Sequence, residues 1–262
     1  MKRTLIAPVI DDFPEQFHNL LRNHDVYDSS CSPQARVFFI DADEGYYLKK
    51  SPTGTLKNEA DMTKYMHSKG LSAQVLAYVS AQCDWLLTSA IRGEDCTHKM
   101  YLNSPERLCD TLAQRLRALH ETDFSGCPIT DRTKTYIDTV HANFIAKEYD
   151  ISYYQSNSSI APAIEDIYKF VSENASILKS DTLLHGDYCL PNIMLDNWRF
   201  SGFIDVGNGG VGDRHIDLFW GAWTLNFNLK TDKYRQRFFD AYGRDKICLD
   251  TIRLISACEV FG

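Results

Sequence analysis

The stretch LLHGDYCLPNIML, residues 183 to 195, is the most informative part of this sequence. It holds His185, Asp187 and Asn192 within eight residues, with apolar residues on both sides. Pro191 prevents a regular helix between the last two, because its ring clashes with the preceding turn. Taken alone, the stretch also fits a polar turn between two buried strands, in which Asp and Asn bond to nearby backbone groups.

A second polar cluster follows in FSGFIDVGNGG, residues 200 to 210, where Asp205 ends an apolar run and Gly207 permits a sharp turn. An aspartate, an asparagine five residues later and a second aspartate after the next strand suit magnesium-dependent phosphoryl transfer. One carboxylate accepts the hydroxyl proton of the acceptor, while the amide and the other carboxylate hold Mg²⁺ through hard oxygen ligands.

The glycine-rich run GNGGVG, residues 207 to 212, does not form a nucleotide-binding motif. Neither GxGxxG opening a helix after a first strand nor GxxxxGK[ST] is present, and the glycines follow Asp205 instead of preceding a lysine. This run is therefore predicted to be a flexible turn.

Composition excludes several classes of protein. A chain of 262 residues with 44% hydrophobic content suits one large domain or two lobes. The net charge of −7 argues against a nucleic-acid surface, which would be basic. The eight cysteines never form CxxC, so we expect reduced thiols and no structural zinc. The first residues lack a signal-peptide core and no apolar run reaches membrane-spanning length, so we expect a cytoplasmic protein without a membrane partner.

The first third of the chain reads as a sheet with one helix. Strands are predicted at 36–41 and 45–50 around the turn ADEG, and a helix at about 55–69. The apolar runs 74–80 and 83–89 follow as further strands. After Gly93 the pattern becomes helical.

Two apolar stripes with helical spacing mark the core of the second part: Leu108, Leu112, Leu116 and Leu119, and Ile160, Ile164, Ile167 and Val171. Ser104 followed by Pro105 is a helix start signal. Short strands are expected between 182 and 204, and helices from Arg214 onward. The chain is therefore predicted to be a strand-rich lobe followed by a helix-rich lobe.

HGDYCLPNIM followed by RFSGFIDVG resembles the signature of aminoglycoside phosphotransferases, most closely the 3′-phosphotransferases of the kanamycin/neomycin kinase type. The resemblance extends to ALHETDFSGCP at 118–128, GVGDRHIDL at 210–218 and the terminal CEVF. It implies an α+β, bilobal, protein-kinase-like fold, with an N-terminal antiparallel sheet lobe containing one helix and a larger helical lobe. The nucleotide-binding lobe would span residues 1–92 with a hinge at about 88–93, and the catalytic and substrate-binding lobe residues 93–262.

The resemblance also implies roles for the polar residues quoted above. Asp187 would be the catalytic base, and Asn192 with Asp205 would hold Mg²⁺. His185 would orient this loop. An equally good interpretation is that His185 is simply a buried histidine bonded to backbone.

The nucleotide contacts are expected in the first lobe. Strand alternation allows only one of Lys49 and Lys50 to face inward, and the resemblance selects Lys49, which would contact the α- and β-phosphates and pair with Glu59. Tyr47 would stack on adenine. The same resemblance places backbone groups of Ser89 and Ile91 at the base edge and Ser32 in a phosphate-covering loop, SSCSPQARVF at 29–38, which lacks the usual glycine.

The acceptor site is expected to offer carboxylates to ammonium groups. The carboxylate candidates are Glu259, the chain-terminal carboxylate of CEVFG, Asp150 and Glu148. Phe261 and Gly262 are further candidates for contact with the acceptor. The alternative for Glu259 is that it is a solvent-exposed residue at the end of a helix, without a role in binding. Cys258, Gly262, Asn208 and Asn226 depart from the family pattern, and residues 147–155 carry few acids.

Together with the resemblance, these residues predict an ATP- and Mg²⁺-dependent kinase, with GTP left open, and the resemblance implies that it phosphorylates a hydroxyl of a small cationic amino sugar. It would be a monomer or weak dimer. Two alternatives remain: a metabolic kinase acting on choline, a sugar or a similar alcohol, and a nucleotide-binding module without turnover. A protein kinase is least favoured, because HGD stands where HRD would be and no APE segment follows Asp205.

Overall fold

The computed structural model describes residues 3–31, 35–154 and 162–262. By its contacts the chain divides into two compact units. The first unit comprises residues 1–95 and 193–207, and the second comprises residues 96–192 and 208–262. The segment 193–207 thus leaves the second unit and returns to the first, whereas the predicted lobe boundary at residues 92 and 93 treats each lobe as one continuous stretch.

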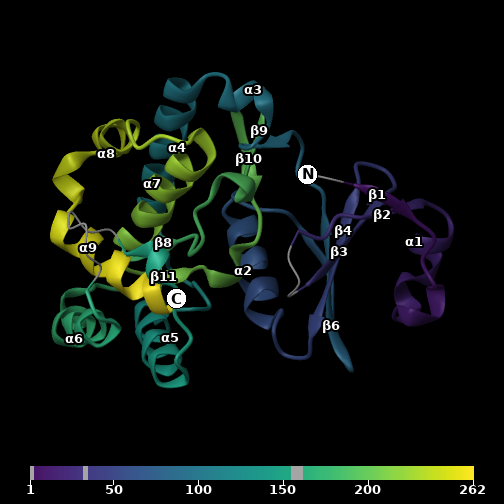
Figure 1. The fold of residues 1–262 in the computed structure, drawn as a ribbon. Helices are drawn as coiled ribbons and strands as arrows, with labels where there is room; N and C mark the ends of the chain where they lie inside the picture. Colours follow the sequence, from purple (N-terminus) through teal and green to yellow (C-terminus); the bar gives the residue numbers. More distant parts are fainter. Residues whose placement is uncertain (1–2, 32–34, 155–161) are drawn as a thin grey trace. The chain divides into compact units, whose positions relative to one another are not determined.

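The first unit is built on a six-stranded antiparallel sheet (Figure 1). Its strands, in spatial order, are β1 (Thr4–Ile6), β2 (Asp25–Asp28), β3 (Arg36–Asp41), β4 (Tyr46–Pro52), β6 (Cys83–Ser89) and β5 (Val75–Ser80). The four strands predicted between residues 36 and 89 are confirmed. One face of the sheet buries Phe38, Ile40 and Leu48 with Trp85, as strand alternation requires.

Two helices accompany this sheet, α1 (His18–Arg22) and α2 (Lys57–Ser68). The sequence did not predict α1, whereas α2 falls within the predicted range. The start of α2 is fixed by the buried carboxylate of Asp84, which accepts the backbone N–H of Leu56 at 2.9 Å. Asp84 also accepts Tyr78 Oη at 3.0 Å and Ser80 Oγ at 2.6 Å, so it ties α2 to the far strand β5.

A smaller antiparallel sheet completes the first unit, with β7 (Glu94–Asp95), β9 (Ile193–Asp196) and β10 (Arg199–Phe203) in the order β10-β9-β7. The backbone N–H of Phe203 bonds to the carbonyl of Leu71 at 2.8 Å, and Ser72 Oγ donates to the carbonyl of Phe203 at 2.8 Å. These bonds bring the end of β10, and hence Asp205, beside the segment that follows α2.

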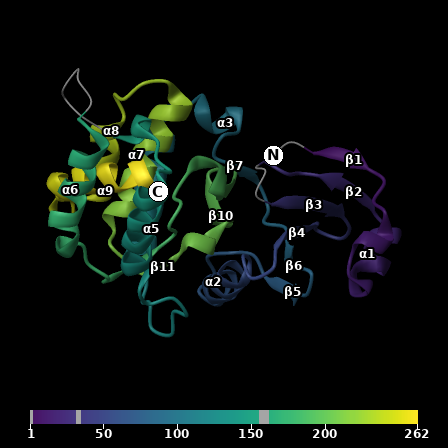
Figure 2. The same ribbon diagram turned by 60° about the horizontal axis from the view of Figure 1, so that its bottom comes forward.

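The second unit is helical (Figure 2). Its helices are α3 (Lys99–Leu102), α4 (Pro105–His120), α5 (Arg132–Ala146), α6 (Ile164–Asn174), α7 (His215–Leu229), α8 (Arg235–Tyr242) and α9 (Leu249–Cys258). The predicted start of α4 at Pro105 is confirmed, and its four stripe leucines are buried. The sequence did not single out α5.

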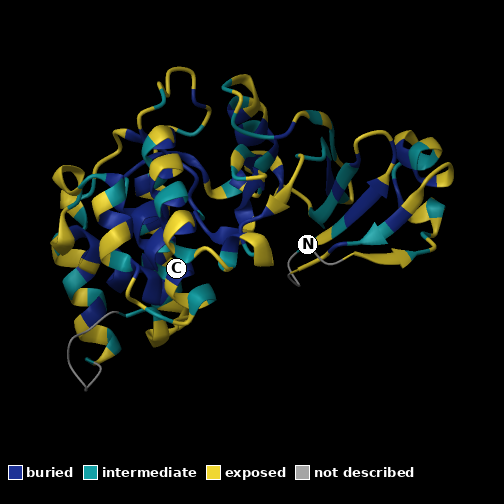
Figure 3. Ribbon diagram, turned by 90° about the horizontal axis from the view of Figure 1, so that it is seen from above, coloured by how far each residue is buried: buried dark blue, intermediate teal, exposed yellow. Residues whose placement is uncertain are grey.

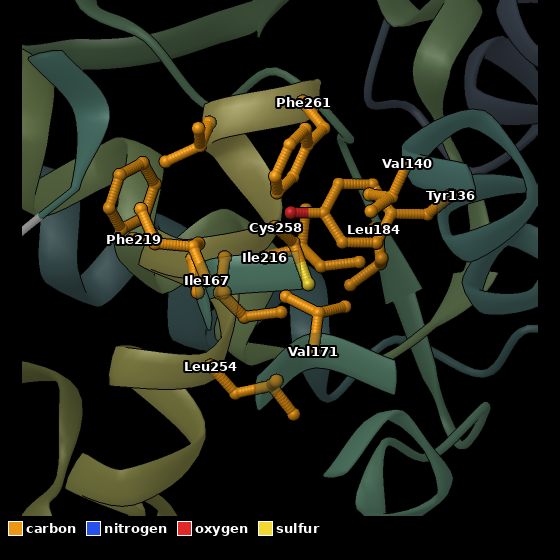
Figure 4. Packing of buried hydrophobic residues seen from close by; sticks show 13 residues of the cluster. Tyr136, Val140, Ile167, Val171, Leu184, Ile216, Phe219, Leu254, Cys258 and Phe261 are labelled. Atoms are coloured by element: carbon orange, nitrogen blue, oxygen red, sulfur yellow. The ribbon is translucent and has the colours of Figure 1, made fainter. Parts of the chain in front are cut away.

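The core of the second unit gathers side chains from α5, α6, α7 and α9 (Figure 4). Ile167 and Val171 of the predicted second stripe lie in it, Ile164 packs at its edge, and Ile160 is outside the described residues. Figure 3 shows how these helices alternate buried and exposed positions along their length. The amphipathic spacing is therefore core packing.

The glycine-rich segment 207–212 is not the flexible turn that its composition suggested. After a short 3₁₀ turn, Val206–Asn208, it forms strand β11 (Gly210–Gly212), which pairs antiparallel with β8 (Thr182–Leu184). All three residues of β11 are buried. The prediction was wrong because the partner strand, which satisfies the backbone of this segment, lies far away in the sequence.

The eight cysteines, all within the described residues, are free thiols as expected. Among the helices that the structure describes, none combines the length and the apolar character needed to cross a membrane.

Candidate active site

A cavity of about 210 Å³ lies within the first unit. Its lining includes six residues that the sequence singled out: Tyr47, Lys49, Glu59, Ser89, Ile91 and Asp205. These residues come from β4, α2, the end of β6 and the segment after β10. Four separate parts of the chain thus place the six predicted residues around one cavity.

Lys49 lies at the centre of a charged cluster. Its Nζ donates to both oxygens of Glu59, at 2.8 and 3.0 Å, and to Asp205 Oδ1 at 2.8 Å. Burial alone would lower the pKa of Lys49, but the carboxylates of Asp205 and Glu59 more than offset it and raise this pKa. Lys49 is therefore a fixed cation. Burial raises the pKa of the Glu59 carboxyl against the opposing effect of Lys49.

The register of β4 explains why Lys49 and not Lys50 faces the cavity. Leu48 is fully buried in the sheet core, and Lys50 Nζ lies 4.9 Å from the ring centroid of Trp85. Tyr47 and Lys49 line the cavity on the opposite face. Pairing of Lys49 with Leu86 on β6 continues the ladder without a bulge at this point. The two lysines therefore lie on opposite faces of β4, as strand alternation requires, and Lys49 is the one that lines the cavity.

Asp205 adopts a left-handed backbone conformation, with φ of 54°. Non-glycine residues rarely do so, and such strain is concentrated at functional positions. Its side chain remains 51% exposed although one oxygen binds Lys49. Two residues later, a Cβ on Gly207 would lie 3.2 Å from the Cβ of Glu59, so glycine lets this turn approach α2 closely.

The stretch predicted to cover phosphates contributes Ser29, Cys31, Ala35 and Val37 to the cavity lining. Ser32 itself lies outside the described residues. Sequence reasoning did not single out Thr63, Ser72, Met194 or Ile204, which also line the cavity. They are small or apolar residues on elements whose position depends on the fold, so no local pattern marks them.

In the second unit, Asp187 and Asn192 are held together. Asn192 Nδ2 donates to the Asp187 carbonyl at 3.0 Å and to Asp187 Oδ2 at 2.9 Å. The 3₁₀ turn Leu190–Asn192, which contains Pro191, folds the chain back so that this contact forms. Because the amide nitrogen is directed at Asp187, the amide oxygen points away from it. Asp187 is half-buried and Asn192 is buried.

The loop that carries Asp187 is anchored by Asp217, a fully buried residue of α7. Its carboxylate accepts the backbone N–H groups of His185 and Gly186, each at 2.8 Å, and lies 3.2 Å from His120 Nε2. His185 is fully buried, and its Nδ1 lies 3.3 Å from the backbone nitrogen of Asp187. This position suits equally an orienting role and the alternative of a buried histidine bonded to backbone. Sequence reasoning missed Asp217 and His120, although both stand in the stretches ALHETDFSGCP and GVGDRHIDL.

The candidates at the chain terminus are placed unequally. Asp150 and Glu148 are exposed, and the Asp150 backbone nitrogen donates to the Val260 carbonyl at 2.7 Å, which joins this segment to the terminus. Gly262 is exposed, whereas Phe261 is buried in the core. Its carbonyl accepts Asn143 Nδ2 at 2.8 Å.

Glu259 is not a solvent-exposed residue at a helix end, because only 4% of it is exposed. Its Oε1 accepts Tyr136 Oη at 2.8 Å and Trp220 Nε1 at 3.1 Å. Burial, with a contribution from the charge of Asp187, raises the pKa of Glu259 to about 7. The sequence could not show this burial, because Tyr136 and Trp220 are distant along the chain.

Replacing Glu259 with glutamine is expected to change how stability depends on pH. The pKa of Glu259 in the folded chain, about 7, exceeds its ordinary value of 4.5, so the folded state binds more protons. The wild type should therefore lose about 3 kcal/mol relative to Glu259→Gln as pH rises from about 4.5 to about 7. Urea unfolding across this range measures the difference, and parallel curves for the two proteins would contradict it.

Comparisons with known proteins show the family of this chain. Residues 29–254 match the model of the phosphotransferase enzyme family. The chain belongs to this family. It is 52% identical over 254 residues to the probable aminoglycoside 3′-phosphotransferase of Lactococcus lactis subsp. lactis (strain IL1403), covering 97% of this chain and 96% of that protein. It is 27% identical over 229 residues to the aminoglycoside 3′-phosphotransferase of Niallia circulans, covering 82% and 83%.

Solved structures of phosphotransferases share the fold. The crystal structure of an aminoglycoside 3′-phosphotransferase of type VIII matches with a TM-score of 0.72 at 19% identity, covering 95% of this chain and all of that one (100%). An aminoglycoside phosphotransferase from Streptomyces rimosus matches with a TM-score of 0.71 at 21% identity, covering 88% and 91%. The predicted α+β kinase-like fold is confirmed.

Proposed function

We propose that this phosphotransferase uses ATP and Mg²⁺ to phosphorylate a hydroxyl of an aminoglycoside, as a 3′-phosphotransferase. The observation that carries the proposal is the Lys49, Glu59 and Asp205 cluster lining the cavity of the first unit. The printed names of the relatives, above all the one at 52% identity, support the acceptor class. A cytoplasmic location, where ATP is available, belongs to the same proposal.

In the proposed nucleotide site Lys49 binds the α- and β-phosphates, and Glu59 keeps its ammonium directed at the cavity. Tyr47 stacks on the base, and backbone groups of Ser89 and Ile91 meet its polar edge. Ser32 belongs to the loop that covers the phosphates. The observed lining supports this arrangement for all of these residues except Ser32, which lies outside the described part of the chain.

Asn192 and Asp205 are proposed as the Mg²⁺ ligands, and their chemistry fits. Asn192 presents an amide oxygen because its nitrogen is engaged with Asp187, and Asp205 is half-exposed with a second carboxylate oxygen. In the described residues no three His, Cys, Asp or Glu side chains gather as metal ligands, which suits an ion held largely by phosphates and water. When bound, Mg²⁺ neutralises charge on the transferred phosphoryl group.

Asp187 is proposed as the base. The hydrogen bond from Asn192 fixes one carboxylate oxygen, so the other can accept the proton of the acceptor hydroxyl. As the acceptor oxygen attacks the γ-phosphorus, the bond from that phosphorus to the β,γ-bridging oxygen breaks and ADP departs. The products are the phosphorylated alcohol and ADP.

For the acceptor, the exposed carboxylates of Asp150 and Glu148 are proposed to receive ammonium groups, and Gly262, which is also exposed, is proposed to contact the bound acceptor. Phe261 and Glu259 are proposed to hold the terminus in place, since both are buried. The bond from Asp150 to the Val260 carbonyl supports a single acidic region formed by these two segments.

A coupled ATP-consumption assay tests the proposal with kanamycin, neomycin, choline and neutral sugars as acceptors. Turnover of an aminoglycoside, with loss of activity on Mg²⁺ removal, is the expected result. Turnover of choline or a neutral sugar without turnover of either aminoglycoside would show a metabolic kinase. Absence of ATP consumption with every acceptor would show a nucleotide-binding module.

Asp205→Ala is expected to weaken Mg²⁺-dependent ATP binding by about tenfold or more, because it removes a charged ligand worth about 1.5–3 kcal/mol. Lys49 keeps its contacts with Glu59 in this variant, so ATP binding without Mg²⁺ should change little. Calorimetric titration with and without Mg²⁺ separates the two effects. Equal Mg·ATP affinity in both proteins would rule out Asp205 as a ligand.

A further inference from the structure

Four aromatic side chains form a continuous array in the second unit, which we call the aromatic shelf: Tyr153, Trp220, Trp223 and Phe227. The Tyr153 ring lies 5.7 Å from that of Trp220 and 5.8 Å from that of Trp223. The two tryptophan rings are 5.3 Å apart, and Trp223 stacks on Phe227 at 4.9 Å with an interplanar angle of 11°. Three of the four come from α7 at positions i, i+3 and i+7, hence from one side of the helix.

The shelf is partly open to solvent. Phe227 is 55% exposed, and the other three rings are partly buried. A single exposed apolar side chain needs no explanation. Here the exposed ring continues a row of three rings that are only partly buried, so solvent reaches a contiguous aromatic surface.

The shelf lies beside the loop that carries the proposed base. Thr224, on the same helix, has its Oγ1 bonded to the backbone nitrogen of Leu190 at 3.1 Å. Trp220 donates to Glu259, and burial together with the charges of Asp150, Glu259 and Asp187 raises the pKa of Tyr153. Hydrogen bonds and negative charge therefore connect the rings with the region where the acceptor is proposed to bind.

One ring of the shelf already receives an ammonium group. Lys230 Nζ lies 4.3 Å from the centroid of Phe227. A cation over an aromatic face within about 6 Å is attracted by the ring quadrupole. Lys230 is exposed and follows the end of α7, so a ligand cation can take its place.

We propose that the aromatic shelf binds the amino-sugar acceptor, with the apolar face of one sugar ring on Trp223 and an ammonium group on Phe227 in place of Lys230. This inference rests on the proposed function and adds a determinant of acceptor affinity. Residues 147–155 offer only Glu148 and Asp150 as acids. The shelf supplies apolar and cation–π contacts where carboxylates are few.

The test combines steady-state kinetics with tryptophan-fluorescence titration by kanamycin. Phe227→Ala and Trp223→Ala should raise the KM and Kd for kanamycin by about tenfold, with kcat within about twofold and the KM for ATP unchanged. Trp223→Phe should keep most of the affinity, because an aromatic face remains. The loss of kanamycin affinity should persist at high salt. Salt screens contacts between carboxylates and ammonium groups, whereas it does not screen stacking of a sugar ring on an aromatic ring.

Two variants serve as matched controls. Lys230→Ala should bind kanamycin as well as the wild type or better, because it removes a competing cation. Phe124→Ala, which removes another exposed phenylalanine of the same unit, should leave kanamycin binding unchanged. If both Phe227→Ala and Trp223→Ala bound kanamycin with wild-type affinity, the shelf would have only a packing role. The inference would then be wrong, while the proposed function would be unaffected. If the wild type phosphorylates choline or a neutral sugar and not kanamycin, the proposed function fails and the inference fails with it.

Discussion

Replacing Asp187 with alanine is expected to lower turnover by about 10²- to 10⁴-fold, the usual cost of losing a general base. Nucleotide affinity should stay nearly unchanged, because Asp187 is proposed to act on the acceptor hydroxyl and touches neither adenine nor Lys49. Its only described side-chain contact with a proposed metal ligand is the bond from Asn192. Kinetics with saturating ATP and acceptor, together with ATP titration, measure both quantities.

Asp187→Asn is the matched control for shape, because it keeps the side-chain volume and an oxygen for the Asn192 amide while it removes the basic carboxylate. It should be almost as inactive as Asp187→Ala and should unfold at nearly the wild-type temperature. If Asp187→Ala kept half of the wild-type turnover, the base would have to be sought elsewhere.

Lys49→Ala is expected to reduce ATP-dependent turnover by about 10²-fold or more, the scale of losing one preorganised donor to a phosphoryl group. It should also destabilise the fold by about 3 kcal/mol, because Glu59 is left buried without its cation. The side chains of Lys49 and Glu59 are only 20% and 13% exposed, so solvent screens this pair weakly. Turnover and urea unfolding check the two effects.

Lys50→Ala is the control, because Lys50 is the neighbour on the opposite face of β4 and contacts Trp85. It should retain wild-type turnover and lose little stability. Equal losses in the two variants, or a larger loss for Lys50→Ala, would mean that the register of β4 has been misassigned.

The stability deficit of Lys49→Ala should grow with pH. Without Lys49, burial raises the pKa of Glu59 above its unfolded value, so the folded state holds a proton that the unfolded state releases. The Lys49→Ala variant then keeps its stability at pH values below the pKa that Glu59 has in the unfolded chain. It loses stability as the pH rises through the pKa that Glu59 has in the folded chain. Unfolding curves of Lys49→Ala at about pH 4 and pH 8 should therefore differ more than those of the wild type.

The sequence predicted those parts of the site that depend on local geometry. Alternation along β4 allowed only one of Lys49 and Lys50 to face inward, although the resemblance was needed to select Lys49. Pro191 excluded a regular helix between Asp187 and Asn192. Both are short-range consequences of backbone geometry. The helix stripes likewise predicted the buried leucines of α4, since a period of 3.6 residues leaves one face inside.

The remaining parts depend on contacts between distant segments. His120 and Asp217 meet although 97 residues separate them, and Asp217 then fixes the loop before Asp187. Glu259 is buried because Tyr136 and Trp220 bond to it from two other helices. No local pattern carries such information. Sequence reasoning therefore left a solvent-facing alternative for Glu259 and assigned no role to Asp217.

Gly186, between His185 and Asp187, limits how this sequence can evolve. Its φ is +83°, and a Cβ at this position would lie 1.8 Å from the carbonyl oxygen of Asn208. One base change converts a glycine codon into an arginine codon, and that change would turn HGD into the HRD of protein kinases. The resulting side chain has no room unless the turn at Val206–Asn208 moves with it. The two signatures therefore differ by a single base change, yet in this chain that change also demands a new backbone path at residues 186 and 208.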